Sequence, residues 1–137
     1  MIEICPLEPA DLPAVLKLWR ETEGVTLGVA DSPEELLCYL DRNPGLSVVA
    51  KVEGRVVGAV LSGHDGRRGY LHHLAVEPAH RNQGVGEAMV RRCLLSLRAA
   101  GIMKSHVFVR GDNNLGQRFW SHHECIERDD LMVFSHL

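Results

Sequence analysis

The six residues 81–86 read Arg-Asn-Gln-Gly-Val-Gly and decide how the chain around them folds. A strand-like run, Tyr70–Glu77, precedes them, and a helix-like run, Val85–Ala100, follows. A turn between a strand and a helix brings backbone N–H groups and a helix N-terminus together, which suits an anion. Glycine lets a bulky phosphate approach the backbone, and Arg81 adds a forked donor that is always charged. The sequence therefore predicts a pyrophosphate-binding loop at residues 81–86.

Length and composition are those of one globular domain. The 137 residues are 45% hydrophobic and 24% charged, enough for one core and too few for two domains. The net charge of −3 argues against a nucleic-acid partner, which a basic surface would attract. The apolar runs are too short to span a membrane, and the first residues do not resemble a signal peptide. We therefore expect one cytoplasmic domain, residues 1–137, without a nucleic-acid or membrane partner.

The histidines and cysteines do not have the spacing of metal ligands. His72 and His73 are adjacent in a predicted strand, where we expect them to point to opposite faces. The four cysteines are far apart in the sequence, so we expect reduced, partly buried thiols. We therefore predict no metal site. The cysteines are Cys5, Cys38, Cys93 and Cys125.

The rest of the chain shows helical and strand patterns bounded by turn residues. Ser32-Pro33-Glu34-Glu35 is a capping box with proline at the first helical position. Glu53-Gly54 joins two β-branched runs and predicts a hairpin. The expected helices are Pro9–Thr22, Ser32–Asn43, Val85–Ala100 and Asn114–His122. The expected strands are Met1–Leu7, Leu46–Val52, Arg55–Ser62, Tyr70–Glu77 and His106–Arg110, with a closing pair at Cys125–Arg128 and Leu131–His136.

This order of elements predicts an α/β (α+β) fold in a single domain. An antiparallel meander is followed by one βαβ crossover, so the sheet is expected to be mixed and mostly antiparallel, with six to seven strands. About four helices are expected to cover both of its faces.

Three pieces of sequence, each in its proper element, carry a family resemblance. They are Leu74-Ala75-Val76-Glu77-Pro78 before the loop, Arg81-x-x-Gly84-x-Gly86 within it, and Asn113 six residues before Phe119-Trp120. At these positions the chain resembles the GCN5-related N-acetyltransferase (GNAT) superfamily. It is similar to the small bacterial members of the ribosomal-protein alanine acetyltransferase type.

The resemblance implies a GNAT fold with splayed central strands and direct acetyl transfer from acetyl-CoA to a primary amine, without a metal. It implies that the loop amides bind the pyrophosphate and that the strand before the loop pairs with the pantetheine arm by β-augmentation. Asn113 would hold that arm, although it is also placed to cap the next helix. The implied cofactor-binding residues are Leu74, Ala75, Val76, Arg81, Asn82, Gln83, Gly84, Val85, Gly86, Asn113 and Phe119.

For proton transfer we favour His72, which lies two residues before Leu74 and is expected to share its face. An imidazole titrates near neutrality and can accept the proton of an attacking amine. The alternative is a half-buried strand histidine bonded to the backbone. Tyr70 is a second polar candidate. Two positions differ from the family pattern: Phe108 replaces a glutamate, and Trp120 replaces a tyrosine. The indole N–H of tryptophan can donate a hydrogen bond but does not release its proton at neutral pH.

Two other functions stay open. The missing proton-handling side chains allow a catalytically weak acyl-CoA-binding sensor or interaction module. A domain for another nucleotide is disfavoured because no Walker lysine follows the loop. The acceptor amine is not identified, although the resemblance implies that Gly24–Asp31 lines its side of the site. The resemblance also leaves a homodimer open.

Overall fold

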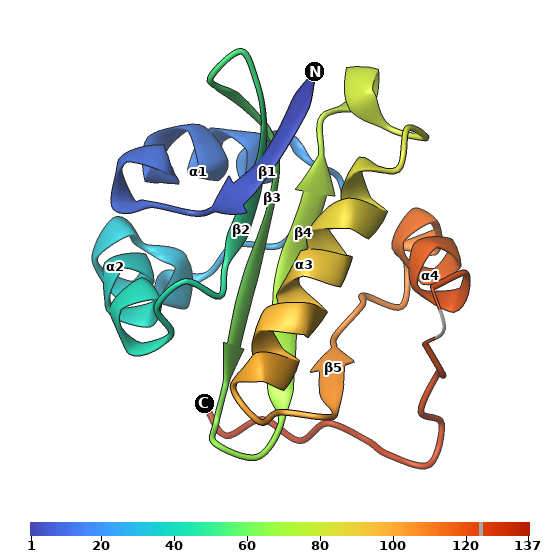
Figure 1. The fold of residues 1–137 in the computed structure, drawn as a ribbon. Coiled ribbons are helices and arrows are strands. Elements are labelled where there is room, and N and C mark those ends of the chain that lie inside the picture. Colours follow the sequence, from blue (N-terminus) through green and yellow to red (C-terminus); the bar gives the residue numbers. More distant parts are fainter. Residues whose placement is uncertain (124) are drawn as a thin grey trace.

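The computed structural model describes residues 1–123 and 125–137 and shows a five-stranded sheet (Figure 1). The strands lie in sequence order, antiparallel except for the parallel pair β4 and β5, so the mixed, mostly antiparallel sheet is confirmed. The described residues form five strands instead of the six to seven predicted. The strands are β1 (Ile2–Pro6), β2 (Val48–Val52), β3 (Arg55–His64), β4 (Gly69–Val76) and β5 (Ser105–Val107). The helices are α1 (Leu12–Glu21), α2 (Pro33–Arg42), α3 (Val85–Ala99) and α4 (Asn114–Ser121), with 3-10 turns η1 (Pro9–Asp11), η2 (Val29–Asp31) and η3 (Pro78–His80).

Local signals account for the boundaries of α2 and of the β2–β3 hairpin. The Ser32 hydroxyl accepts a hydrogen bond from the Glu35 N–H at 3.2 Å, and Pro33 opens the helix, as predicted. Glu53 and Gly54 both have positive φ values, 50° and 79°, as a tight hairpin between right-handed twisted strands requires.

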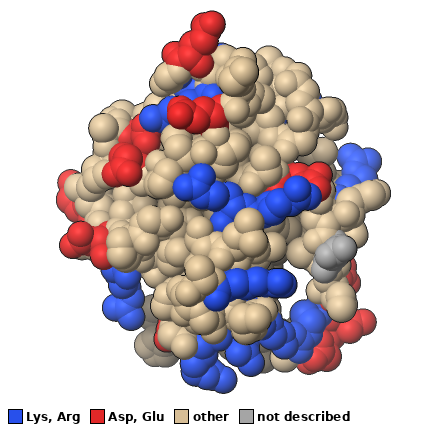
Figure 2. All heavy atoms as spheres, in the orientation of Figure 1, with Lys and Arg blue, Asp and Glu red and all other residues tan. Residues whose placement is uncertain are grey.

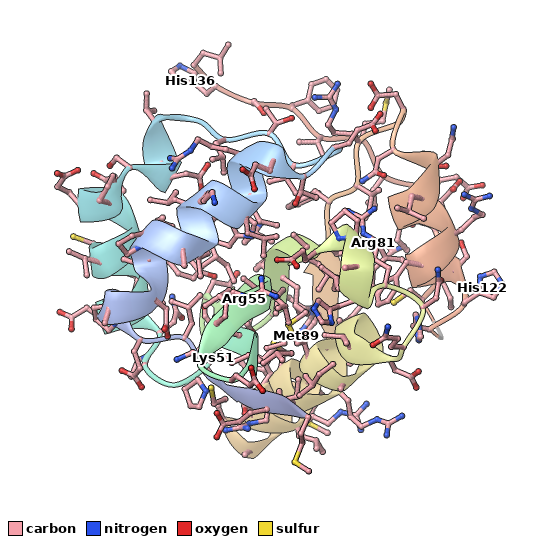
Figure 3. All side chains as sticks on the ribbon, turned by 90° about the horizontal axis from the view of Figure 1, so that it is seen from above. Lys51, Arg55, Arg81, Met89, His122 and His136 are labelled. Carbon is pink, nitrogen blue, oxygen red and sulfur yellow. The ribbon has the colours of Figure 1, made fainter. Side chains whose placement is uncertain are left out.

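Helices cover both faces of the sheet, as predicted. α1 and α2 pack on one face around Trp19 and Leu36, and α3 packs on the other through Met89. Figure 3 shows Met89 between the sheet and α3 in the view from above. The approach is close, because a Cβ on Gly58 of β3 would lie 2.9 Å from the Met89 Cε atom. Among the described residues, no helix has both the length and the hydropathy that crossing a membrane requires.

β4 and β5 separate soon after they begin. They pair only over Gly69–Leu71 and Ser105–Val107, so β5 is shorter than the predicted strand His106–Arg110. Beyond Val107 the chain turns toward the segment that follows α1, where the Arg110 guanidinium donates to the Thr26 hydroxyl at 2.7 Å. Within residues 1–123 and 125–137, therefore, no strand lies beside the edge of β4 toward Val76, and the expected splay is present.

A β-bulge in β4 changes the direction of its side chains. Leu61 of β3 pairs with His72, whereas Ala59 pairs with Ala75, so His73 and Leu74 together face one β3 residue. His73 has a φ of 58°, and its ring centroid lies 6.4 Å from that of His72. The prediction that the two histidines point to opposite faces is therefore wrong. Because the bulge resets the alternation, His72 and Leu74 do not share a face either: Leu74 packs toward the α3 core.

The predicted closing strand pair, Cys125–Arg128 and Leu131–His136, is not formed. This segment, red in Figure 1, has exposed side chains throughout, including Phe134 at 88% exposure. Its alternating apolar residues have strand propensity, but a strand also needs a partner for its backbone groups, and the described residues supply none. The predicted turn at 129–130 is present, and the Arg128 guanidinium binds the Asp130 carboxylate.

We predict that Gly58→Val destabilises the protein by about 1–3 kcal/mol, because the new side chain overpacks the contact between β3 and α3. The midpoint of urea unfolding measures the change. Gly111→Val is the matched control, since a Cβ at Gly111 meets no atom within 4 Å. Equal midpoints for the two variants would show that α3 does not pack closely against Gly58.

Candidate active site

A cleft of about 530 Å³ opens where β4 leaves β5, bounded by the 81–86 loop, the start of α3 and α4. All the predicted cofactor-binding residues except Gln83 line this cleft. The Gln83 side chain is exposed and donates to the Ala79 carbonyl at 3.4 Å. His72 and Trp120 also line the cleft, whereas Tyr70 does not. The cofactor residues in its wall are Leu74, Ala75, Val76, Arg81, Asn82, Gly84, Val85, Gly86, Asn113 and Phe119.

The two glycines of the loop have different roles. Gly84 is the N-cap of α3 with a φ of 80°, and a Cβ there would meet open space, so the position needs glycine for its backbone conformation. A Cβ on Gly86 would instead lie 3.0 Å from the Phe119 ring. A side chain at Gly86 would therefore press on Phe119 of α4, while the Gly86 backbone lines the cleft.

The anion-binding features of the loop are local. α3 begins at Val85, and its first N–H groups lie at the cleft wall formed by Val85, Gly86 and Glu87. Figure 2 shows Lys and Arg side chains spread over the face that α3 forms, although the net charge of the chain is −3. The N-terminus of a helix can hold a diphosphate.

Arg81 holds the end of β4. Its Nε donates to the Val76 carbonyl at 2.8 Å, and Figure 3 shows Arg81 near the middle of the molecule in the view from above. The Glu77 N–H donates to the Val57 carbonyl of β3 at 2.8 Å. Because consecutive N–H groups of a strand point to opposite sides, the Val76 N–H points away from β3 and into the gap.

Asn113 caps α4, which confirms the prediction that this side chain is placed to cap the next helix. Its Oδ1 accepts a hydrogen bond from the Gly116 N–H at 2.9 Å. Its side chain also packs against Gly24, where a Cβ would lie 2.6 Å from the Asn113 Nδ2 atom. One side chain thus sets the start of α4 and fixes it to the segment that follows α1.

His72 lies in a cluster of rings. Its ring is nearly parallel to that of Tyr70, at 10° and 6.4 Å between centroids, so these two side chains lie on the same face of β4. Burial lowers the pKa of His72 below its usual 6.5, and the nearby His73 lowers it further. The imidazole is therefore neutral at pH 7 and able to accept a proton.

The α4 side of the cleft is also aromatic. Phe119 and Trp120 pack at 87° with centroids 5.1 Å apart, and both contact the α3 core. His123, which the sequence reasoning did not assign to the site, lines the cleft with its ring 4.2 Å from that of Phe119. Its position one turn after Phe119 on the helical spacing was the available signal.

A second residue pair was also missed. His73 Nε2 lies 3.0 Å from Asp31 Oδ1, and the His73 ring packs against Trp19 at 5.1 Å. The other Asp31 oxygen accepts from the Gly28 N–H at 2.9 Å. This links the predicted acceptor segment, Gly24–Asp31, to the bulge of β4. A second hollow of about 470 Å³ beside α2 shares His72 and His73 with the cleft.

Thiols and metal clusters do not contribute to this site in the part of the chain that the structure describes. Cys93 lies on the buried face of α3, and burial raises its pKa to about 12. Cys5, Cys38 and Cys125 do not line the cleft. Within residues 1–123 and 125–137, no three His, Cys, Asp or Glu side chains gather as a metal site would require.

Comparison with known proteins agrees with this geometry. The Acetyltransferase (GNAT) family profile matches residues 12–123. An acetyltransferase of Pectobacterium atrosepticum is 36% identical over 114 residues, which cover 82% of this chain and 79% of that one.

Two solved structures share the fold at lower identity. An N-acetyltransferase of Thermoplasma acidophilum in complex with coenzyme A has a TM-score of 0.77 at 19% identity, covering 89% of this chain and 87% of that one. The ribosomal-protein-S18-alanine N-acetyltransferase of Escherichia coli has a TM-score of 0.74 at 20% identity, covering 90% and 77%. The chain therefore belongs to the acetyltransferase (GNAT) family and is an N-acetyltransferase.

Proposed function

We propose that the cleft binds acetyl-CoA and that the chain transfers the acetyl group to a primary amine, either on a peptide or on a small molecule. The observation that carries the proposal is the edge of β4 that leads to the start of α3 and that no strand of the described residues pairs with. A peptide-like arm can add to such an edge as an extra strand, and the diphosphate attached to it can meet the helix N-terminus. The residues of the cleft fit both parts of this ligand.

The chain supplies the groups that direct transfer to an amine needs. Acetyl-CoA brings a thioester, and the Val76 N–H, aimed into the gap, is placed to donate to its carbonyl oxygen as negative charge develops. His72 accepts the proton of the attacking amine, since its lowered pKa keeps it neutral at pH 7. Trp120 in the cleft wall can donate a hydrogen bond toward the departing sulfur, while water supplies the proton.

We predict that acetyl-CoA raises the melting temperature of the protein, ATP does so far less, and Gly84→Val abolishes the acetyl-CoA shift. A β-branched residue is strained at a φ of 80° and would displace the loop amides. Gly66→Val is the matched control, with a φ of 94° and open space in the β3–β4 turn. Equal stabilisation by acetyl-CoA and ATP contradicts the proposal that this loop binds the pyrophosphate of acetyl-CoA. So does an acetyl-CoA-induced rise in melting temperature that is as large in Gly84→Val as in Gly66→Val.

We predict that His72→Ala lowers kcat by about 100-fold, as loss of a general base does, while the acetyl-CoA thermal shift stays. In the unchanged protein, activity should fall only below pH 6.5, because His72 has a lowered pKa and loses its acceptor capacity when protonated. The acidic limb should disappear in His72→Ala.

The control for this experiment is His136→Ala, at the exposed end of the chain (Figure 3). An acidic limb that persists in His72→Ala removes His72 as the base. Binding of acetyl-CoA without turnover of any amine favours the sensor alternative.

A further inference from the structure

An aromatic patch continues from His72 along β4 and β5, away from the 81–86 loop. The Tyr70 ring lies 6.1 Å from that of Phe108 at 18°, and 5.8 Å from that of His106. Phe108 also packs beside His72, with centroids 6.4 Å apart at 28°. We call these four side chains, Tyr70, His72, His106 and Phe108, the ring patch.

Phe108 is the accessible member of the ring patch. Its side chain is 61% exposed, and it lines the cleft together with His72. Tyr70 lies two residues before His72 on β4, a step of about 7 Å in an extended strand. A ligand whose amine reaches His72 in the cleft therefore has the exposed Phe108 ring beside it, 6.4 Å from the His72 ring.

The acceptor side does not offer the cluster of free carboxylates that a polycationic amine would need. Both Asp31 oxygens are already engaged, by His73 and by the Gly28 N–H. Glu87 is paired with Arg91 at 2.9 Å. The remaining described carboxylates of the two hollows are Glu23 and Glu35, one in each.

We propose that the acceptor is a small primary amine carried on a short chain from an aromatic ring, and that this ring packs on Phe108, whose own ring stacks on Tyr70. The proposal rests on the proposed function and names its substrate class. Aromatic rings at centroid distances of about 4.5–7 Å attract one another beyond the burial of their surface. The ring patch therefore favours an aryl group over an alkyl group of the same size, and its faces also attract the ammonium before it loses a proton.

The test compares 2-phenylethylamine with 2-cyclohexylethylamine, which has the same carbon skeleton without the aromatic ring. Spermidine and a peptide with an N-terminal alanine are the other acceptors, and free thiol release gives kcat/KM for each. We expect 2-phenylethylamine to exceed 2-cyclohexylethylamine by about five- to tenfold. Phe108→Leu should remove this preference through a higher KM for the aryl amine, and Phe108→Tyr should keep it.

Leu95→Ala is the control variant, because Leu95 on α3 is as exposed as Phe108, at 62%, and lies outside the cleft wall. This variant should have the same kcat/KM as the unchanged protein for both 2-phenylethylamine and 2-cyclohexylethylamine. The inference is overturned if the cyclohexyl amine, spermidine or the peptide is the better acceptor, or if Phe108→Leu keeps the aryl preference. Such a result with a normal acetyl-CoA thermal shift leaves the proposed function standing. Absence of that shift overturns both.

Discussion

The site depends on the point at which β4 stops pairing with β5. Three paired residues on each strand join β4 to β5, and beyond them no described strand pairs with this edge of β4, where the Val76 carbonyl accepts from Arg81. Buried backbone groups must find partners, so an edge of this kind inside a cleft is prepared for a ligand that carries its own amides. The bulge at His73 adds a second effect, because it turns His72 and His73 to the same side of the strand.

Close contacts then join the loop to the last helix. Gly86 lies against the Phe119 ring, and Asn113 lies against Gly24 while it caps α4. Neither contact leaves room for a methyl group at the glycine without movement of its neighbour. α4 therefore sits at a defined distance from both the start of α3 and the segment after α1, and the width of the cleft follows from these two glycines.

Much of the fold follows from local sequence, and the site only in part. Ser32, Pro33 and Gly54 act on their immediate neighbours, so the boundaries they set could be predicted. The bulge could not, because it arises from how β4 pairs with β3, 10 or more residues away in the chain. The same limit explains the error at 125–137: alternation predicts strand propensity, whereas a strand forms only where another backbone is available. The contact between Gly86 and Phe119 could not be predicted either, because it joins two helices that are far apart in the sequence.

The cleft and the second hollow are both lined by His72 and His73, and this has a consequence for the order in which substrates bind and products leave. Because both hollows reach these two histidines, a second ligand can approach them while the first stays in the cleft. Cys93, with its pKa raised to about 12, cannot serve as a temporary acyl carrier in such a scheme. Initial-rate plots at several fixed concentrations of the second substrate should then show intersecting lines, the pattern of a ternary complex, instead of the parallel lines of a ping-pong enzyme.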